Sequence, residues 1–298
     1  MIGWILYSGQ PTAELLKLAD AAQHAGVTLR IVSPATAQVL ITDERQMYVN
    51  GEWLALPDFV IAAFFGDTTY HNISLLNNLE SKGVLCINKA STLLKTKDKL
   101  LTLQLLAAEN IPVPKTLLLS FPCPIELIEK EFSYPLVLKV IGGSKGDGVI
   151  LIDSKKQFTN TIQMLEAAEI TQDVLVQEFI ATSKGRDVRV LIADFEPMAA
   201  MVRSTVKTDE FKSNYSIGGQ VEPFDLTPQV IEIARKVSKI LDLNTGGIDL
   251  LFTEDGFKVC EANSMPGFIG MEKASGLDIS SLLLKSVLNH VLQLKNQK

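Results

Sequence analysis

The sequence predicts two architectures in succession, a parallel α/β unit at the N-terminus and a mixed α+β unit after it. Short apolar runs alternate with amphipathic helical patterns over residues 1–92, which is typical of parallel strands joined by helices. From residue 93 on, strand patterns follow one another more closely. The length of 298 residues allows about two domains at ~100–200 residues each. We therefore expect an N-terminal α/β domain over 1–92 and a second domain over 93–298.

The N-terminal unit begins with a strand pattern at 2–7, followed by an amphipathic helical pattern at 11–25 that Gly26 ends. Helices between successive strands favour parallel pairing. Asn50-Gly51 predicts a two-residue hairpin turn, because both residue types adopt positive φ angles readily. The other predicted elements of this unit are strands at 28–32, 59–65 and 85–87 and a helix at 72–82.

The second unit begins with a helical pattern at 99–109, which Pro112 and Pro114 end because neither residue can continue a helical hydrogen-bond ladder. A small α+β module follows, with predicted strands at 115–119, 135–140, 149–153 and 174–178 and predicted helices at 125–131 and 155–168. The last third has strands over 187–203, an irregular polar loop, a helix at 228–241, a hairpin at 247–262 and a helix from Ile279.

Composition and charge exclude several classes of protein. Lys and Arg number 28 against 34 Asp and Glu, a net charge of −6, which gives no electrostatic reason to expect nucleic-acid binding. No uncharged run reaches the ~20 residues of a membrane span, and the first residues lack the features of a signal peptide. The three cysteines lie too far apart for a zinc motif or a disulfide framework. We expect a cytoplasmic protein that binds neither nucleic acid nor a membrane.

Four glycines lie between Gly142 and Gly148, in the connection between two predicted strands. Glycines there let backbone N–H groups approach a polyphosphate, and Lys139 before them adds a positive charge. A flexible hairpin tip explains the glycines equally well. The stretch also fits the Gly-x-Ser-x-Gly pattern of hydrolases, but that motif needs a helix after the turn, and a strand pattern follows here.

The predicted hairpin near the C-terminus carries two carboxylates. If Glu254-Asp255-Gly256 is a three-residue turn, Asp249 lies opposite Glu261, and Asn263 returns to the same face. Two carboxylates and an amide oxygen are hard ligands that suit Mg²⁺. The alternative is a pair of half-exposed strand acids, although facing acids repel unless a cation lies between them.

These features belong to a set of motifs that follow a definite order along the chain. The set comprises Asn88 with Lys97-Asp-Lys99, Leu138-Lys139 with the glycine loop, Gln177-Glu-Phe-Ile180, Asp187-Val-Arg189, Arg203, Ser213-Asn214 with Gly218-Gly219, Gly247-Ile-Asp249, and Glu261-Ala-Asn-Ser-Met-Pro-Gly267 with Gly270-Met-Glu-Lys273. It resembles the ATP-grasp superfamily of carboxylate–amine ligases, most closely its RimK-like branch, the ribosomal-protein glutamate ligases. The resemblance implies a pre-ATP-grasp domain followed by an ATP-grasp fold whose small lid subdomain spans roughly 112–180.

The resemblance also implies roles for individual residues. For the nucleotide, it implies contacts from Lys99, Lys139, Gly146, Gln177, Glu178, Phe179, Ile180, Asp187, Lys212, Ser213 and Asn214, with Lys99 and Lys139 on the phosphates, 177–180 at the adenine and Asp187 at the ribose. For catalysis, it implies Arg203, Lys139 and Asn214 near the transferring phosphoryl group and the acceptor carboxylate. For metal binding, it implies Asp249, Glu261 and Asn263, holding two Mg²⁺ or Mn²⁺ ions.

The implied activity is amide-bond formation at the expense of ATP. The family converts a carboxylate to an acyl phosphate, which an amine then attacks, so catalysis depends on positioning and on charge neutralisation. The resemblance favours addition of glutamate or another amino acid to a protein, peptide or small-molecule acceptor, by an enzyme that forms homo-oligomers. It does not distinguish a single addition from chain extension.

The chain departs from the RimK-like pattern at two places. Lys212 stands where these ligases usually carry arginine, and Phe64-Phe65 where they carry Arg-Ile, so the bidentate contacts of arginine are lost there. We expect the amino-acid or acceptor pocket to differ. Two alternatives stay open: a D-alanine–D-alanine type of ligase, because 263–268 resembles the end of those enzymes, and a nucleotide-binding regulatory protein without turnover.

Overall fold

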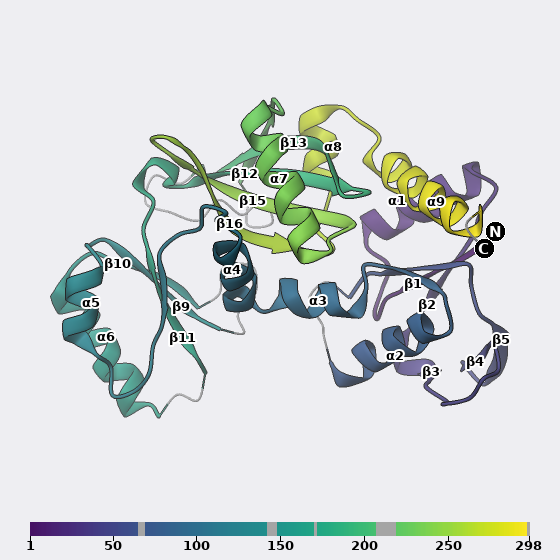
Figure 1. The fold of residues 1–298 in the computed structure, drawn as a ribbon, viewed down its shortest axis with the longest axis horizontal. Helices are drawn as coiled ribbons and strands as arrows, with labels where there is room; N and C mark the ends of the chain where they lie inside the picture. The colour runs from purple at the N-terminus through teal and green to yellow at the C-terminus, as the bar shows by residue number, and fades with distance from the viewer. Residues whose placement is uncertain (65–68, 142–147, 170–171, 207–218, 297–298) are drawn as a thin grey trace.

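The computed structural model describes residues 1–64, 69–141, 148–169, 172–206 and 219–296. Its three main sheets follow one another along an elongated molecule (Figure 1). The N-terminal sheet lies at one end, the sheet formed by β8–β11 lies at the other, and the C-terminal sheet lies between them. The predicted fold class, an α/β unit followed by an α+β unit, is confirmed.

The N-terminal sheet has the strand order β2-β1-β6-β7, and all its pairs are parallel. Its elements are β1 (Ile2–Leu6), α1 (Ala13–His24), β2 (Thr28–Val32), β6 (Phe59–Ala62), α2 (Tyr70–Ser81) and β7 (Leu85–Ile87). Both faces of the sheet are buried: Ile5 and Ile61 belong to the hydrophobic cluster on one face, and Trp4 and Val60 to the cluster on the other. Burial on both faces explains why these strands read as continuous apolar runs.

A small three-stranded sheet of β3 (Ala37–Gln38), β4 (Gln46–Val49) and β5 (Glu52–Ala55), preceded by the short helix η1 (Pro34–Thr36), packs beside this unit. The predicted turn between β4 and β5 is confirmed, with φ of 52° at Asn50 and 87° at Gly51. Two helices then lead to the rest of the chain, α3 (Ala90–Lys97) and α4 (Lys99–Ala108), and Figure 1 shows both between the outer parts of the molecule. The helix α4 is as predicted, but α3 is not, because its short polar sequence shows little helical periodicity.

The sheet formed by β8–β11 is called the middle sheet here because it comes second along the sequence, although it lies at one end of the molecule. It is antiparallel with the order β10-β9-β11-β8. Its elements are β8 (Thr116–Leu118), α5 (Ile125–Glu131), β9 (Leu136–Val140), β10 (Val149–Ile152), α6 (Lys155–Ala167) and β11 (Val174–Glu178), all close to the predicted positions. Leu136 and Leu138 of β9 pack with Phe158 and Ile162 of α6 in a separate hydrophobic cluster. The middle sheet therefore has a core of its own. The glycine loop at 142–147 lies outside the described residues.

The C-terminal sheet is antiparallel with the order β14-β13-β12-β15-β16. Its elements are η2 (Ala181–Ser183), β12 (Arg186–Ala193), β13 (Glu196–Ser204), β14 (Gln220–Phe224), α7 (Pro228–Leu241), β15 (Thr245–Thr253), β16 (Gly256–Asn263), α8 (Ile269–Ser275) and α9 (Ile279–Asn296). The prediction of an irregular loop before residue 228 is wrong over β14. This strand is an exposed edge strand, and its Pro223 weakens the strand pattern. The seven-residue α8 was not predicted either.

Helix α9 joins the two ends of the sequence. It packs against α1 (Figure 1), and Leu283 and Val287 of α9 share one hydrophobic cluster with Ile5 of β1 and Leu191 of β12. Because this cluster is common to the N-terminal and C-terminal sheets, the two are held together by buried apolar contacts. Among the described residues, no helix is both long enough and apolar enough to span a bilayer.

Candidate active site

The hairpin of β15 and β16 brings Asp249 opposite Glu261, as predicted, but by a different route. Thr253 pairs with Gly256, so the turn has two residues and the predicted three-residue turn is wrong. A register shift next to Asp249 leaves Cys260 as an extra residue in β16. This bulge offsets the shorter turn by one position. The two carboxyl residues therefore face each other.

Asp249 is 3% exposed and is bonded by two guanidinium groups. Arg189 donates from Nε to Oδ1 and from a terminal nitrogen to Oδ2, both at 2.7 Å. Arg203 donates to Oδ2 at 2.8 Å. These bonds follow from strand pairing, since Arg189 on β12 lies directly opposite Asp249 on β15.

Asp187 completes this buried ion network. It lies opposite Arg203 in the pairing of β12 with β13 and accepts two hydrogen bonds of 2.7 Å from that guanidinium. Asp187 and Arg189 therefore form a face of cross-strand ion pairs, in which Asp187 pairs with Arg203 and Arg189 pairs with Asp249.

The network keeps the carboxylate of Asp249 ionised. Burial alone would raise the pKa of Asp249, but the charges of Arg189 and Arg203 outweigh burial and hold the pKa of this carboxyl well below its usual range. Burial would likewise lower the pKa of Arg203, and the charges of Asp249 and Asp187 raise it instead. Two positive and two negative groups thus share a buried site, with each charge hydrogen-bonded to an opposite one.

Glu261 has a looser environment than Asp249. Its side chain is 32% exposed, and Lys99 at the start of α4 places Nζ 3.8 Å from its Oε2. Asn263 donates from Nδ2 to Oε1 of Glu261 at 3.1 Å. The structure thus brings together the three residues that the sequence predicts as metal ligands and one of the two predicted phosphate-binding lysines.

Lys139 of β9, the second predicted phosphate-binding lysine, is near enough to the hairpin for its charge to act on β16. Burial raises the pKa of the Cys260 thiol, the charge of Lys139 opposes this, and the carboxylates of Glu261 and Asp249 add to the rise. Lys139 on β9 is therefore close enough to β16 for its charge to act on the bulged residue. Lysines from two elements, Lys99 of α4 and Lys139 of β9, thus lie near the acidic hairpin.

The predicted adenine-binding residues lie where the middle sheet meets the C-terminal sheet. Gln177, 3% exposed, donates to Oγ1 of Thr116 at 2.8 Å. Glu178 accepts from the backbone N–H of Lys115 at 2.7 Å and also bonds Lys258 of β16. Its carboxylate therefore links β11 to the residue before β8 and to β16. Phe179 and Ile180 follow directly and are partly buried.

Several predicted residues cannot be placed. Gly146, Lys212, Ser213, Asn214 and Phe65 lie outside the described residues. Phe64 is described, and its side chain is 7% exposed within the core of the N-terminal unit. Phe64, which stands where the resemblance implies an arginine, therefore packs into that core.

Arg189 belongs to the predicted motif Asp187-Val-Arg189 and was expected to add positive charge where ATP binds, but its pairing with Asp249 was not predicted. The signal was present in the sequence, because Asp187 and Arg189 are two residues apart in a strand and point to the same face. What the sequence lacked was the register with β15, which joins residues 60 positions apart.

The donor chemistry at the hairpin fits a divalent cation. Asp249 and Glu261 face each other on adjacent strands, Asn263 adds an amide next to Glu261, and these are the hard oxygen donors that Mg²⁺ prefers. In the part of the chain that the structure describes, no group of three His, Cys, Asp or Glu side chains could hold a metal ion. The candidate set therefore depends on Asn263 as its third ligand.

Comparisons with known proteins agree with this geometry. The model of the RimK-like ATP-grasp domain matches residues 96–287, and that of the RimK pre-ATP-grasp domain matches residues 2–93. A probable alpha-L-glutamate ligase of Thioalkalivibrio sulfidiphilus is 32% identical over 273 residues, covering 91% of this chain and 90% of the relative. A probable alpha-L-glutamate ligase from Coxiella burnetii is 30% identical over 285 residues, covering 95% of this chain and 94% of the relative.

Solved structures show the same fold at low sequence identity. The ATP-grasp ligase PsnB in complex with a minimal precursor superposes with a TM-score of 0.77 at 18% identity, covering 97% of each chain. The macrocyclase MdnC from Microcystis aeruginosa, bound to its precursor peptide, gives 0.74 at 15% identity, covering 97% of this chain and 100% of that one. The chain belongs to the RimK-like ATP-grasp family, with its pre-ATP-grasp domain. It is therefore an ATP-dependent ligase.

Proposed function

We propose that this enzyme joins the amino group of glutamate to a carboxylate acceptor through an acyl phosphate. The relatives named probable alpha-L-glutamate ligases support glutamate as the amino acid. The observation that carries the proposal is the hairpin on which Asp249 and Glu261 face each other, with Lys99 beside Glu261 and Lys139 close enough for its charge to act on β16. Such a site can neutralise a polyphosphate on one side and hold its counter-cation on the other.

The reaction has two steps with a simple balance. A carboxylate oxygen of the acceptor forms a bond to the γ-phosphorus of ATP as the bond from that phosphorus to the β–γ bridging oxygen breaks, which releases ADP. The amine then forms a bond to the acyl carbon, the carbon–oxygen bond to phosphate breaks, and the amine loses a proton. The products are an amide, ADP and inorganic phosphate.

The chain's own residues act in this scheme by position and charge. Lys99 and Lys139 would bind the phosphates, and Arg203 and Asn214 would act on the transferring group. Asp249, Glu261 and Asn263 would hold two Mg²⁺ or Mn²⁺ ions. Such ions, when bound, neutralise the charge on the phosphates. Arg189 and Arg203 prepare Asp249 for this role, because they keep its carboxylate ionised and in a fixed orientation before any ligand arrives.

We also propose a division of the chain at residues 92 and 93, with a lid over about 112–180 that closes on the nucleotide. The separate core of the middle sheet supports a rigid lid. Gln177 to Ile180 would meet the adenine, Asp187 the ribose, and Gly146, Lys212 and Ser213 further parts of the nucleotide. Glu178, bonded to Lys115 and Lys258, would act as the hinge contact. Closure would exclude water, which otherwise hydrolyses an acyl phosphate.

The test follows oxygen atoms. Purified enzyme with Mg²⁺, ATP and glutamate is incubated with candidate acceptors: free amino acids, glutamate-ended peptides and protein termini. With an acceptor whose carboxylate carries ¹⁸O, mass spectrometry should find one ¹⁸O in the released phosphate for each amide formed. ADP release without that transfer would rule out the acyl phosphate. Tight ATP binding with no turnover on any acceptor would favour a regulatory protein.

The amino-acid panel should include D-alanine, D-serine and other amino acids. Solved ligases of this fold include a D-Ala:D-Ser ligase and an ATP-grasp ligase bound to a precursor peptide. Product masses will distinguish glutamate addition from these alternatives, and a ladder of masses will show chain extension. Sedimentation velocity will test the proposed homo-oligomer.

Glu261→Gln tests the cation-binding role with a matched control. Loss of this carboxylate should lower turnover by at least about 100-fold, because even changes in the outer shell of a metal site cost about 10–100-fold. Glu254→Gln makes the same substitution in the exposed turn at the other end of the hairpin and should leave turnover unchanged. Equal turnover in both variants would overturn the assignment of Glu261.

A further inference from the structure

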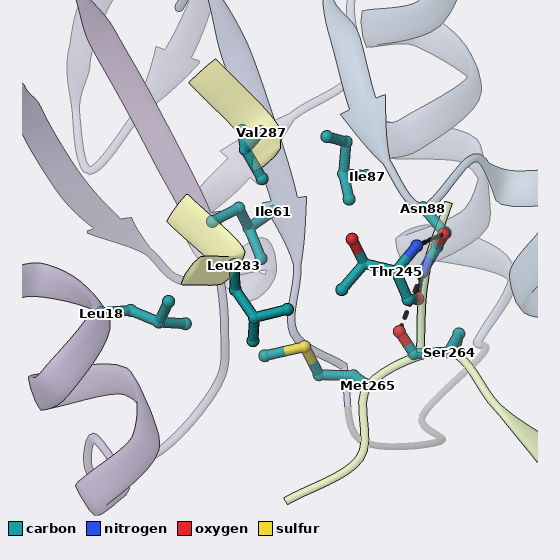
Figure 2. A pocket seen from close by; sticks show the side chains of 9 residues that line it. All are labelled: Leu18, Ile61, Ile87, Asn88, Thr245, Ser264, Met265, Leu283 and Val287. Carbon is teal, nitrogen blue, oxygen red and sulfur yellow. Dashed lines mark hydrogen bonds between the residues drawn. The ribbon is translucent and has the colours of Figure 1, made fainter. Parts of the chain in front are cut away.

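Asn88 lies at the junction between the N-terminal sheet and the hairpin that bears the proposed cation ligands. It follows β7 directly and is 2% exposed. Its Nδ2 donates to the carbonyl oxygens of Thr245 at 2.6 Å and Ser264 at 2.8 Å, and its Oδ1 accepts from the backbone N–H of Thr245 at 3.1 Å. Figure 2 shows the amide between the two backbone segments. Both hydrogens of Nδ2 are thus used.

The two bonded segments are the open ends of the hairpin. Thr245 is the first residue of β15, which carries Asp249. Ser264 follows Asn263, the last residue of β16, which also carries Glu261. One carboxamide therefore fixes the start of one strand relative to the end of the other, next to the proposed third ligand.

The hairpin base has little room to adjust. A Cβ atom added to Gly246 would lie 2.6 Å from the carbonyl oxygen of Asn263, which no real contact allows. On its other side, the junction borders a small cavity of about 20 Å³, lined by apolar side chains such as Ile61, Met265 and Leu283 (Figure 2). A water molecule there could bond one backbone group, but it is not covalently attached to the N-terminal domain and would not fix both strands to it.

We infer that Asn88 is a positioning residue, through which the N-terminal domain sets the placement of Asn263 and Glu261 relative to Asp249. This inference rests on the proposed function, because it takes these three residues as the cation ligands. It predicts that the N-terminal domain, which contributes none of the three cation ligands, nevertheless controls the affinity for the cation and its nucleotide.

Thr92 provides a matched control in the same segment of chain. Its side chain is fully buried, and its Oγ1 donates to the carbonyl oxygen of Asp242 at 2.9 Å. Asp242 caps α7 and precedes the hairpin. Thr92→Val keeps the shape and removes one buried hydrogen bond between the same two parts of the molecule, without touching either strand end.

The experiment measures Mn²⁺ binding in the presence of ADP, by electron paramagnetic resonance of free Mn²⁺ and by calorimetry. Asn88→Ala and Asn88→Asp should weaken Mn²⁺ binding by about 10–100-fold, as expected for a second layer of support around a metal site. The Asn88→Asp substitution places a carboxylate oxygen against two carbonyl oxygens, so this variant tests the donor role directly. Thr92→Val should bind Mn²⁺ as the wild type does, even with a lower melting temperature.

Asn88→Ser keeps a hydroxyl donor, and its Mn²⁺ affinity should fall between those of the wild type and Asn88→Ala. If the other two variants do not fold, the Mn²⁺ affinity of Asn88→Ser alone tests the positioning role of Asn88. Wild-type Mn²⁺ affinity in a folded Asn88 variant, or an equal loss in Thr92→Val, would overturn the inference. If the wild type and Glu261→Gln bind Mn²⁺ equally, the proposed cation site itself fails, and the two failures are thereby distinguished.

Discussion

The two sides of the β15–β16 hairpin differ in how completely their charges are bonded. On the β15 side, Asp249 is 3% exposed and accepts three hydrogen bonds of 2.7–2.8 Å from Arg189 and Arg203. On the β16 side, Glu261 is 32% exposed, and the nitrogen of Lys99 lies 3.8 Å away, beyond hydrogen-bond distance. One side is rigid and the other can still rearrange.

This difference separates two demands on the site. A buried, fully paired carboxylate is held in one orientation, so it serves as a fixed reference for a ligand, but its loss also disturbs the fold. A half-exposed carboxylate near a flexible lysine contributes little to stability and can change partners when a ligand binds. We therefore expect substitutions on the β15 side to change stability strongly and those on the β16 side to change mainly ligand binding.

The largest stability effect is expected for Arg203→Met. Removal of the guanidinium leaves Asp187 without its bidentate partner and Asp249 with one partner fewer, in a buried site. Removal of one partner of a buried ion pair lowers the free energy of unfolding by about 3–5 kcal/mol, because the remaining charge stays buried and uncompensated. Urea unfolding followed by circular dichroism measures this loss.

The matched control for that prediction is Arg235→Met. Arg235 makes a similar bidentate contact with Glu196, but both side chains are close to half exposed. Water can solvate both groups after the substitution, so the free energy of unfolding should change far less than in Arg203→Met. Equal losses in the two variants would show that burial does not distinguish the networks.

A medium effect is expected from pH. The pKa of Asp249 in the folded protein lies below the ~3.9 of an unfolded chain, so between these values the unfolded state binds more protons. The stabilisation is complete above the unfolded pKa and falls with pH through this window, by about 1.4 kcal/mol per pH unit for one proton. Asp249→Asn removes the carboxyl group that binds this proton. From about pH 5 downward, the unfolding free energy of this variant should therefore depend less steeply on pH than that of the wild type. An unchanged slope would contradict the pairing.

Local patterns predicted most of the fold but not its least regular elements. Buried parallel strands such as β1 and β6 stand out as short continuous apolar runs, and α7 stands out through its strong helical periodicity. The strand β14 lies at a sheet edge with mostly exposed residues and a proline, and α8 has only seven residues, so neither carries enough periodic signal.

The candidate site shows where prediction from sequence ends. Counting residues outward from the turn correctly predicts that Asp249 lies opposite Glu261. It does so only because the shorter, two-residue turn and the bulge at Cys260 offset each other. The pairing of Arg189 with Asp249 depends on the register of strands 60 residues apart, which local sequence does not contain. Residue types could therefore identify the site, whereas the bonds within it required the tertiary structure.

The smallest stability effect is expected for Lys99→Met on the β16 side. Lys99 is 36% exposed and makes only a long contact with Glu261, so its loss should change the unfolding free energy by less than about 1 kcal/mol. The KM for ATP should nevertheless rise, because a phosphate loses a positive charge. Lys97→Met, two residues earlier and exposed at the end of α3, should leave both quantities unchanged. If Lys99→Met destabilises the fold as Arg203→Met does, or leaves the KM for ATP unaltered, the two sides of the hairpin do not divide stability from binding.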